Sequence, residues 1–147
     1  MYKEIIDWID IILVPAYFSV FLLLLLYIKK KNPQNILIQK YLIKGFIFKV
    51  ACAIFYALLI HFYYGFGDSL SYFKDAIYLK QQISTGAESF KVLFDSHKTI
   101  RENYSIIAGG GEPGLTVEKV ALLLSYISFS RYLVVTIFFA AIAYSGM

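Results

Sequence analysis

Long runs of apolar residues are the feature of this sequence that most restricts its fold. The run from Ile9 to Ile28 reads IDIILVPAYFSVFLLLLLYI. As an α-helix its roughly 20 residues extend about 30 Å, which is the thickness of the hydrocarbon core of a bilayer. A second run extends from Phe46 to Tyr64 and a third from Arg131 to Met147. We therefore predict an all-α integral membrane protein with about three transmembrane helices, at residues 9–28, 46–64 and 131–147.

Composition excludes a soluble globular domain. Hydrophobic residues make up 59% of the chain and charged residues 16%, whereas soluble domains carry about 25% charged residues. The net charge of +4 does not indicate nucleic-acid binding, because six of the 14 basic residues are lysines clustered between Lys29 and Lys49 without any acid. Such a segment is typical of a cytoplasmic loop. Membrane lipid is thus the predicted partner, and nucleic acid is not one.

The distribution of charge around the first run predicts the orientation of the chain. Glu4, Asp7 and Asp10 precede or begin the run, and lysines follow it, so the N-terminus is expected outside the cytoplasm. The run is not a signal peptide, because it lacks a basic start and a small-residue cleavage site. We expect residues 1–147 to form a single multi-pass domain of the plasma (inner) membrane. Because the last run ends without a polar flank, we expect this domain to be part of a longer protein.

The segment between the first two runs is predicted to be a cytoplasmic connection at residues 29–45. Asn32 and Pro33 favour a turn. Residues 36–43 are expected to form a short helix at the membrane surface, with its lysines reaching the headgroups. The second transmembrane helix then begins at Phe46.

Residues 65–117 are predicted to form an outer segment. Basic and acidic residues are nearly balanced there, unlike the lysine-rich connection. After the break at Gly65–Gly67, Asp68 or Ser69 is expected to cap a helix over residues 70–83. Its apolar residues recur at helical spacing, so we expect an amphipathic helix along the membrane surface that ends at Gly86.

The remaining outer residues predict shorter elements. A second short helix is expected around 89–94, and AGGGEPG at 108–114 is expected to be a flexible loop. A short outer helix over residues 116–129 then precedes a break before Arg131. A continuous helix would instead place the guanidinium at the middle of the bilayer, at a cost of a few kcal/mol.

Carboxylates of the outer segment are the candidate catalytic groups. Asp68 follows glycines that permit a tight turn, and there it can serve as a general base toward a hydroxyl group. The alternative is that Asp68 only caps a helix. Asp75 lies two helical turns further on, so that both carboxylates can face one cleft together with Tyr72 and Lys74. The alternative for Asp75 is a solvated helix face.

Basic residues of the outer segment are candidate ligands of a lipid-linked phosphate or diphosphate. Arg101 and Arg131 can each bind such a group in a bidentate manner, and Lys98 and Lys119 can assist them. Contact with ordinary lipid headgroups is the alternative for all four residues.

A metal site is not predicted, and no cofactor is indicated. Cys52 is the only cysteine and is interpreted as a small buried hydrophobic residue. His61 and His97 have no partners at ligand spacing.

Two motifs carry a resemblance to a known group of enzymes. YYGFGDSLSYF follows the second run, and SYISFSRYLVVTIFFAAIAYSGM forms the last one. Residues 45–147 resemble the N-terminal part of multi-pass membrane glycosyltransferases of the GT-C kind and of exopolysaccharide or O-antigen polymerases. This resemblance implies transfer of a sugar from a polyprenyl (di)phosphate donor at the outer face of the membrane. It implies that Asp68, with Asp75 in reserve, activates the acceptor hydroxyl or takes part in metal binding. The candidate substrate-binding residues are Ser69, Tyr72, Lys74, Arg101 and Arg131.

A different class of function is also compatible with these residues. A non-catalytic subunit that packs its helices in a larger membrane complex would need membrane protein partners but no active site. The residues alone leave both alternatives open.

Overall fold

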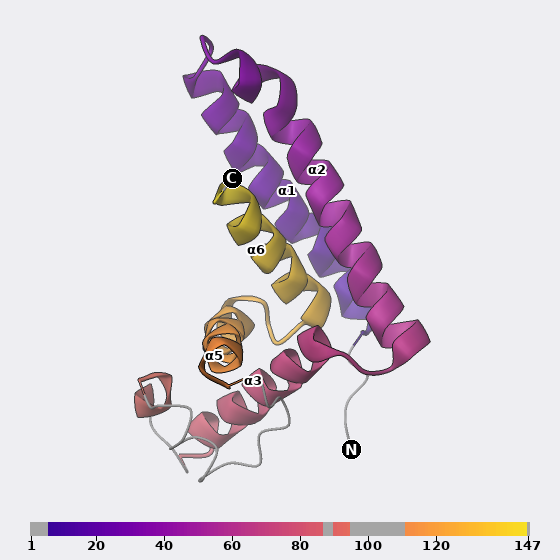
Figure 1. Ribbon diagram of the computed structural model, residues 1–147, viewed down its shortest axis with the longest axis vertical. Coiled ribbons are helices and arrows are strands. Elements are labelled where there is room, and N and C mark those ends of the chain that lie inside the picture. Colours follow the sequence, from indigo (N-terminus) through magenta and orange to yellow (C-terminus); the bar gives the residue numbers. More distant parts are fainter. Residues whose placement is uncertain (1–5, 87–89, 95–110, 147) are drawn as a thin grey trace. The chain divides into compact units, whose positions relative to one another are not determined.

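All regular secondary structure in the described part of the chain is helical. The computed structural model describes residues 6–86, 90–94 and 111–146 (Figure 1). The predicted all-α class is confirmed by five α-helices in these residues. The helices are α1 (Trp8–Lys31), α2 (Ile36–Leu59), α3 (Asp68–Ser84), α5 (Gly111–Ile127) and α6 (Tyr132–Ser145), with a π-helical turn at Ile60–Tyr64 and a 3-10 turn at Phe90–Leu93.

Two of these helices are long and apolar enough to cross a membrane by themselves. They are α1 and the continuous helical segment Ile36–Tyr64. A third span is counted when α5 and α6 are taken together as one broken span. The chain is therefore a multi-pass membrane protein with two to three candidate spans in its described residues, in agreement with the prediction.

The connection between α1 and α2 is shorter than predicted. Only residues 32–35 lie outside helices, and α2 continues without a break through 36–43, so the separate surface helix was a wrong prediction. The side-chain Oδ1 of Asn35 accepts hydrogen bonds from the backbone N–H groups of Leu37 and Ile38, at 3.1 and 3.2 Å, and begins α2 there. No proline follows, and the single Gly45 costs too little to end a helix.

The described residues cluster into two compact units. Residues 1–59 and 131–147 form unit 1, and residues 60–130 form unit 2. Unit 1 contains α1, α2 and α6, and its core is made by Phe46, Val50, Ile137 and Ala140. The ring of Phe18 stacks on that of Phe46 with centroids 6.0 Å apart.

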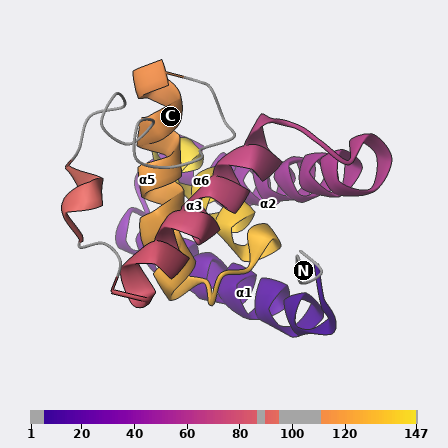
Figure 2. The same ribbon diagram turned by 90° about the horizontal axis from the view of Figure 1, so that it is seen from below.

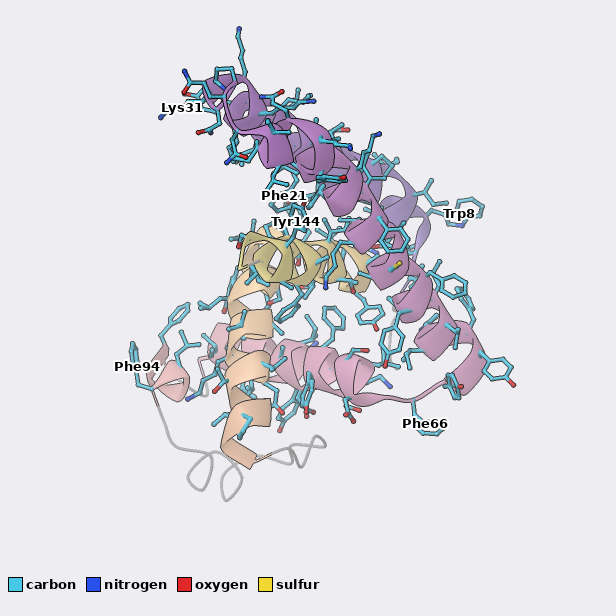
Figure 3. All side chains as sticks on the ribbon, turned by 45° about the horizontal axis from the view of Figure 1, so that its top comes forward. Trp8, Phe21, Lys31, Phe66, Phe94 and Tyr144 are labelled. Carbon is cyan, nitrogen blue, oxygen red and sulfur yellow. The ribbon has the colours of Figure 1, made fainter. Side chains whose placement is uncertain are left out.

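Aromatic contacts extend this core toward α6. Phe21 meets the ring of Phe138 edge-on at 5.2 Å. The Tyr144 hydroxyl donates a hydrogen bond to the carbonyl oxygen of Leu42 at 2.7 Å, and Figure 3 shows Phe21 and Tyr144 close together within the unit. Cys52 is exposed on α2 instead of lying in this core, so its predicted burial was wrong. The core face of α2 passes through Phe46 and Val50, and position 52 lies outside it.

The break before α6 lies where the sequence predicted it. Residues 128–130 form a turn, with positive φ angles of 53° at Phe129 and 59° at Ser130. The helix has 14 residues, which corresponds to about 21 Å. It is shorter than the predicted span at 131–147.

Unit 2 is built on α3 and α5, which cross and pack against each other (Figure 2). The observed range of α3 agrees with the prediction for 70–83, but its N-cap is Gly67 and Asp68 is its first residue. The expected stop at Gly86 is confirmed by a φ of 72°, which favours glycine. The predicted helix at 89–94 is a 3-10 turn in its described part.

Helix α5 begins earlier than the sequence suggested. The predicted start was residue 116, but residues 111–114 are already helical and are not part of a loop. Pro113 lies in the first turn, where its missing N–H group has no intrahelical acceptor to lose. The rest of the predicted loop, 108–110, lies outside the described residues.

Candidate functional site

A glycine corner separates the second candidate span from α3. The π-helical turn ends with a hydrogen bond from the Gly65 N–H group to the Ile60 carbonyl oxygen at 2.8 Å. Gly65 has a φ of 69°, and a Cβ atom there would meet nothing within 4 Å, so the corner is open on this side. At Gly67, a Cβ atom would lie 3.1 Å from the side chain of Ile60. The backbone therefore passes closely over Ile60 immediately before α3 begins.

Asp68 is exposed at the start of α3, directly after this corner. Its carboxylate lies in the first helical turn, where the N-terminal partial charge of the helix favours an anion. Ser69, Tyr72 and Lys74 follow within the next two turns and are partly buried. A Cβ atom at Gly114 would lie 3.3 Å from the ring of Tyr72, so this ring packs closely against α5.

Asp75 has a different environment from Asp68. Its exposed fraction is 2%, whereas Asp68 is exposed. The two residues share a helix side by their spacing, but only the carboxylate of Asp68 is accessible from outside. The predicted catalytic residues therefore do not form one exposed pair.

Glu118 on α5 is a buried acid that the sequence analysis missed. Its exposed fraction is 1%, and both carboxyl oxygens lack a hydrogen-bond partner among the described residues. Burial and the negative charge of Asp75 raise the pKa of Glu118 to about 7. Its spacing gave a usable signal, because Leu115 and Leu122, three residues before and four after it, are both buried.

Lys80 joins α3 to the last turn of α5. Its ammonium group donates to the Ser125 carbonyl oxygen at 2.9 Å and to the Ser130 hydroxyl at 2.8 Å. It also lies 4.6 Å from the centroid of the Tyr126 ring. Burial lowers the pKa of Lys80. A cation at this position neutralises carbonyl groups at a helix C-terminus, which gives Lys80 a structural role in unit 2.

The predicted phosphate ligands lie in different parts of the chain. Arg131 belongs to unit 1, where its Nη1 lies 3.5 Å from Asp7 Oδ2 and 3.7 Å from Asp10 Oδ2. Its charge is therefore already compensated by two carboxylates. Arg101 and Lys98 lie outside the described residues. Among the described residues of unit 2, five predicted site residues lie on one helix, α3: Asp68, Ser69, Tyr72, Lys74 and Asp75.

Within 6–86, 90–94 and 111–146, no three His, Cys, Asp or Glu side chains are grouped as ligands of one ion. The acids at this site are thus arranged as the exposed Asp68 and the buried Asp75 and Glu118.

Comparisons with known proteins identify no relatives of this chain. No family model, curated protein or solved structure matches it.

Proposed function

We propose that this protein transfers a sugar from a polyprenyl (di)phosphate donor to a hydroxyl acceptor at the outer face of the membrane, with Asp68 as the general base. The observation that carries the proposal is the position of Asp68. It is an exposed carboxylate at the start of a helix, and it directly follows a candidate span and a glycine corner that is open at Gly65. A polar acceptor and a membrane-anchored donor meet at such a boundary.

The chemistry requires a base that reaches the acceptor hydroxyl. A carboxylate within hydrogen-bond distance of the hydroxyl accepts its proton while the oxygen attacks the anomeric carbon and the polyprenyl (di)phosphate departs. Asp68 is accessible for this role. Asp75 is not accessible, because its side chain is buried in unit 2 with an exposed fraction of 2%.

The buried acids support a functional site in the same unit. The buried Glu118 carboxyl group, which has no hydrogen-bond partner among the described residues and lies near the acidic Asp75, reduces stability. Perturbed acids of this kind cluster at functional sites. We assign to Asp75 and Glu118 the positioning of α3 against α5, and hence of Asp68, and not direct contact with substrate.

Activity of the purified protein in proteoliposomes tests the proposal. The substrates are a panel of radiolabelled polyprenyl-diphosphate-linked sugars and a soluble oligosaccharide acceptor, and the assay measures label in the acceptor and free polyprenyl diphosphate. Asp68→Asn should lower kcat by about 100-fold or more with little change in KM, as expected for loss of a general base. Asp68→Glu, which retains a carboxylate, should keep part of the activity.

The controls separate the base from its supporting residues. Glu118→Gln should change kcat by less than Asp68→Asn and should alter the pH profile. Full activity of Asp68→Asn would remove this residue from the reaction. Absence of transfer by the wild-type protein with every donor would instead favour the packing subunit.

A further inference from the structure

Unit 1 contains an apolar groove that its own helices leave unfilled. The groove has a volume of about 700 Å³ and is lined by all three helices of the unit. Its lining includes Leu24 and Ile28 of α1, Leu37 and Tyr41 of α2, and Ile142 and Ser145 of α6. This volume lies in the range of about 300–1,000 Å³ that is usual for small-molecule sites.

The groove lies beside the C-terminal turns of α6, which is shorter than its neighbours. Arg131, at the start of α6, contacts Asp7 and Asp10 at the start of α1, so the two helices begin at the same end of the unit. With 14 residues against 24, α6 ends about 15 Å before α1 does. Figure 1 shows the C-terminus of α6 part of the way along the α1–α2 pair. Among the described helices of unit 1, none continues from α6 along the last turns of α1 and the first turns of α2.

The rim of this open end is strongly basic. Five lysines lie in the last turn of α1 and the first turns of α2 (Lys29, Lys30, Lys31, Lys40 and Lys44), and no acid occurs from residue 29 to residue 67. The ammonium group of Lys40 lies 5.2 Å from the ring centroid of Tyr41, which lines the groove. Figure 3 shows Lys31 at this end of α1 and Trp8 at the opposite end.

Helix electrostatics do not account for all of these lysines. Lys29, Lys30 and Lys31 occupy the last turn of α1, where cations stabilise the helix terminus. Lys40 and Lys44 lie in the N-terminal half of α2, where the helix dipole gives a cation no benefit. Both are exposed. Their charge complements an external anion beside an apolar groove.

We propose that this groove binds an acyl chain of an anionic phospholipid whose headgroup contacts Lys40 and Lys44. The apolar lining excludes water from the hydrocarbon chain, and the lysines select the charge of the headgroup. Each lysine near an anionic headgroup contributes about fivefold in affinity. A neutral phospholipid would gain the apolar contact without this selectivity.

Fluorescence quenching by brominated lipids tests the site in the full chain. Trp8 is the only tryptophan, so Trp8→Phe with Tyr41→Trp places a single reporter in the groove. Tyr56→Trp in the same background is the matched control, because Tyr56 is exposed on α2 and does not line the groove. Nanodiscs of neutral phosphatidylcholine receive either brominated phosphatidylglycerol or brominated phosphatidylcholine.

The groove reporter should reach half-maximal quenching at a mole fraction of phosphatidylglycerol at least fivefold below that of phosphatidylcholine. The Tyr56→Trp reporter should respond equally to both lipids. Lys40→Gln with Lys44→Gln should remove the preference of the groove reporter. With Lys40 and Lys44 intact, equal quenching of the groove reporter by both lipids would show ordinary lipid contact and overturn the proposal.

Filling the groove gives a second, independent measurement. Ala141 lines it, whereas Ala143 is exposed on the same helix and does not. Ala141→Phe should weaken quenching by phosphatidylglycerol severalfold, and Ala143→Phe should not. If polyprenyl phosphate relieves the quenching at a lower concentration than unbrominated phosphatidylglycerol does, the groove would be assigned to polyprenyl phosphate instead. Crosslinked dimers with no lipid quenching would assign it to a second copy of the chain.

Discussion

At the residue scale, the buried acids Asp10 and Glu118 lie in different electrostatic environments. Asp10 is 1% exposed, and its Oδ2 accepts a hydrogen bond from the Asp7 N–H group at 2.8 Å and lies 3.7 Å from the Arg131 guanidinium. Glu118 is equally buried, but it has the negative Asp75 as its electrostatic neighbour. The negative charge of Asp10 is compensated by Arg131, whereas Glu118 favours its protonated form. Substitutions at the two positions should therefore have different signatures.

Glu118→Gln should weaken the pH dependence of the stability of unit 2. The pKa of Glu118 is raised from 4.5 to about 7 in the folded state. Between these values the unfolded state releases a proton that the folded state retains, so stability falls as pH rises from about 4.5 to 7. Hydrogen exchange of the α3 and α5 amides from pH 4 to 8 should show this slope in the wild type and little of it in Glu118→Gln.

Asp75→Asn is the matched control for this titration. It removes the charge that contributes to the raised pKa of Glu118 but leaves the burial of that residue unchanged. The fall in stability should then begin at a similar pH and end at a lower one. An unchanged slope in Glu118→Gln would show that another group titrates.

Arg131→Gln should destabilise unit 1 by about 3 kcal/mol, because it leaves the buried Asp10 without a countercharge. Asp7→Asn should cost less than about 1 kcal/mol, since Asp7 is more exposed and asparagine also caps a helix. Unfolding in mixed detergent micelles measures both changes. The double variant Arg131→Gln with Asp10→Asn should be more stable than Arg131→Gln alone. Additive losses in the double variant would contradict this coupling.

Helix identity could be predicted at the element scale more reliably than helix boundaries. Apolar length revealed α1 and α2, and apolar spacing together with Gly86 revealed α3. The join at residues 36–45 was missed because lysines suggested a surface segment, whereas a helix continues through lysines whose side chains reach water. The early start of α5 was missed because three consecutive glycines suggested a loop.

The candidate site could be predicted only where its residues are close in sequence. Asp68, Ser69, Tyr72, Lys74 and Asp75 share one helix, so spacing placed them together. Glu118 is 43 positions beyond Asp75. Its spacing from Leu115 and Leu122 places it on the apolar side of α5, but no local pattern records that this side packs on α3. The partners of Arg131 lie at the other end of the chain, at Asp7 and Asp10, and for the same reason they could not be inferred.

Close packing of α2 and α6 depends on a small residue at position 45. A Cβ atom at Gly45 would lie 2.8 Å from the Tyr144 hydroxyl, which donates to the Leu42 carbonyl. Gly45→Ala should therefore displace this ring and cost about 1–3 kcal/mol. Tyr144→Phe alone should cost about 1 kcal/mol through the lost hydrogen bond.

The double variant tests whether this contact explains the cost. Without the hydroxyl, the nearest ring atoms are 3.3 and 3.4 Å from the new Cβ, so Gly45→Ala should be better tolerated in the Tyr144→Phe background. Detergent-induced unfolding of the four proteins in the cycle gives the coupling energy. Additive effects would show that the destabilisation by Gly45→Ala does not come from contact with the Tyr144 hydroxyl.

At the scale of the whole molecule, the charge pattern changes at Asp68. Residues 29–67 contain six lysines and no acid, whereas residues 68–119 contain six basic and seven acidic residues. From the positive-inside bias we expect the first group in the cytoplasm. The segment Ile36–Tyr64 is long and apolar enough to cross the membrane once, so we expect Asp68 and α3 on the opposite side. The proposed sugar transfer at the outer face requires this arrangement.

Cysteine labelling in intact cells tests this orientation directly. Cys52→Ser first removes the only cysteine, after which Gln34→Cys and Thr85→Cys each introduce one exposed thiol at a helix-free position. A membrane-impermeant maleimide should label position 85 in intact cells and position 34 only after permeabilisation, because the helical segment Ile36–Tyr64 separates them. Labelling of both denatured proteins to the same extent is the control. The reverse pattern would place Asp68 on the cytoplasmic side, and it would exclude an acceptor at the outer face even if the fold is as described.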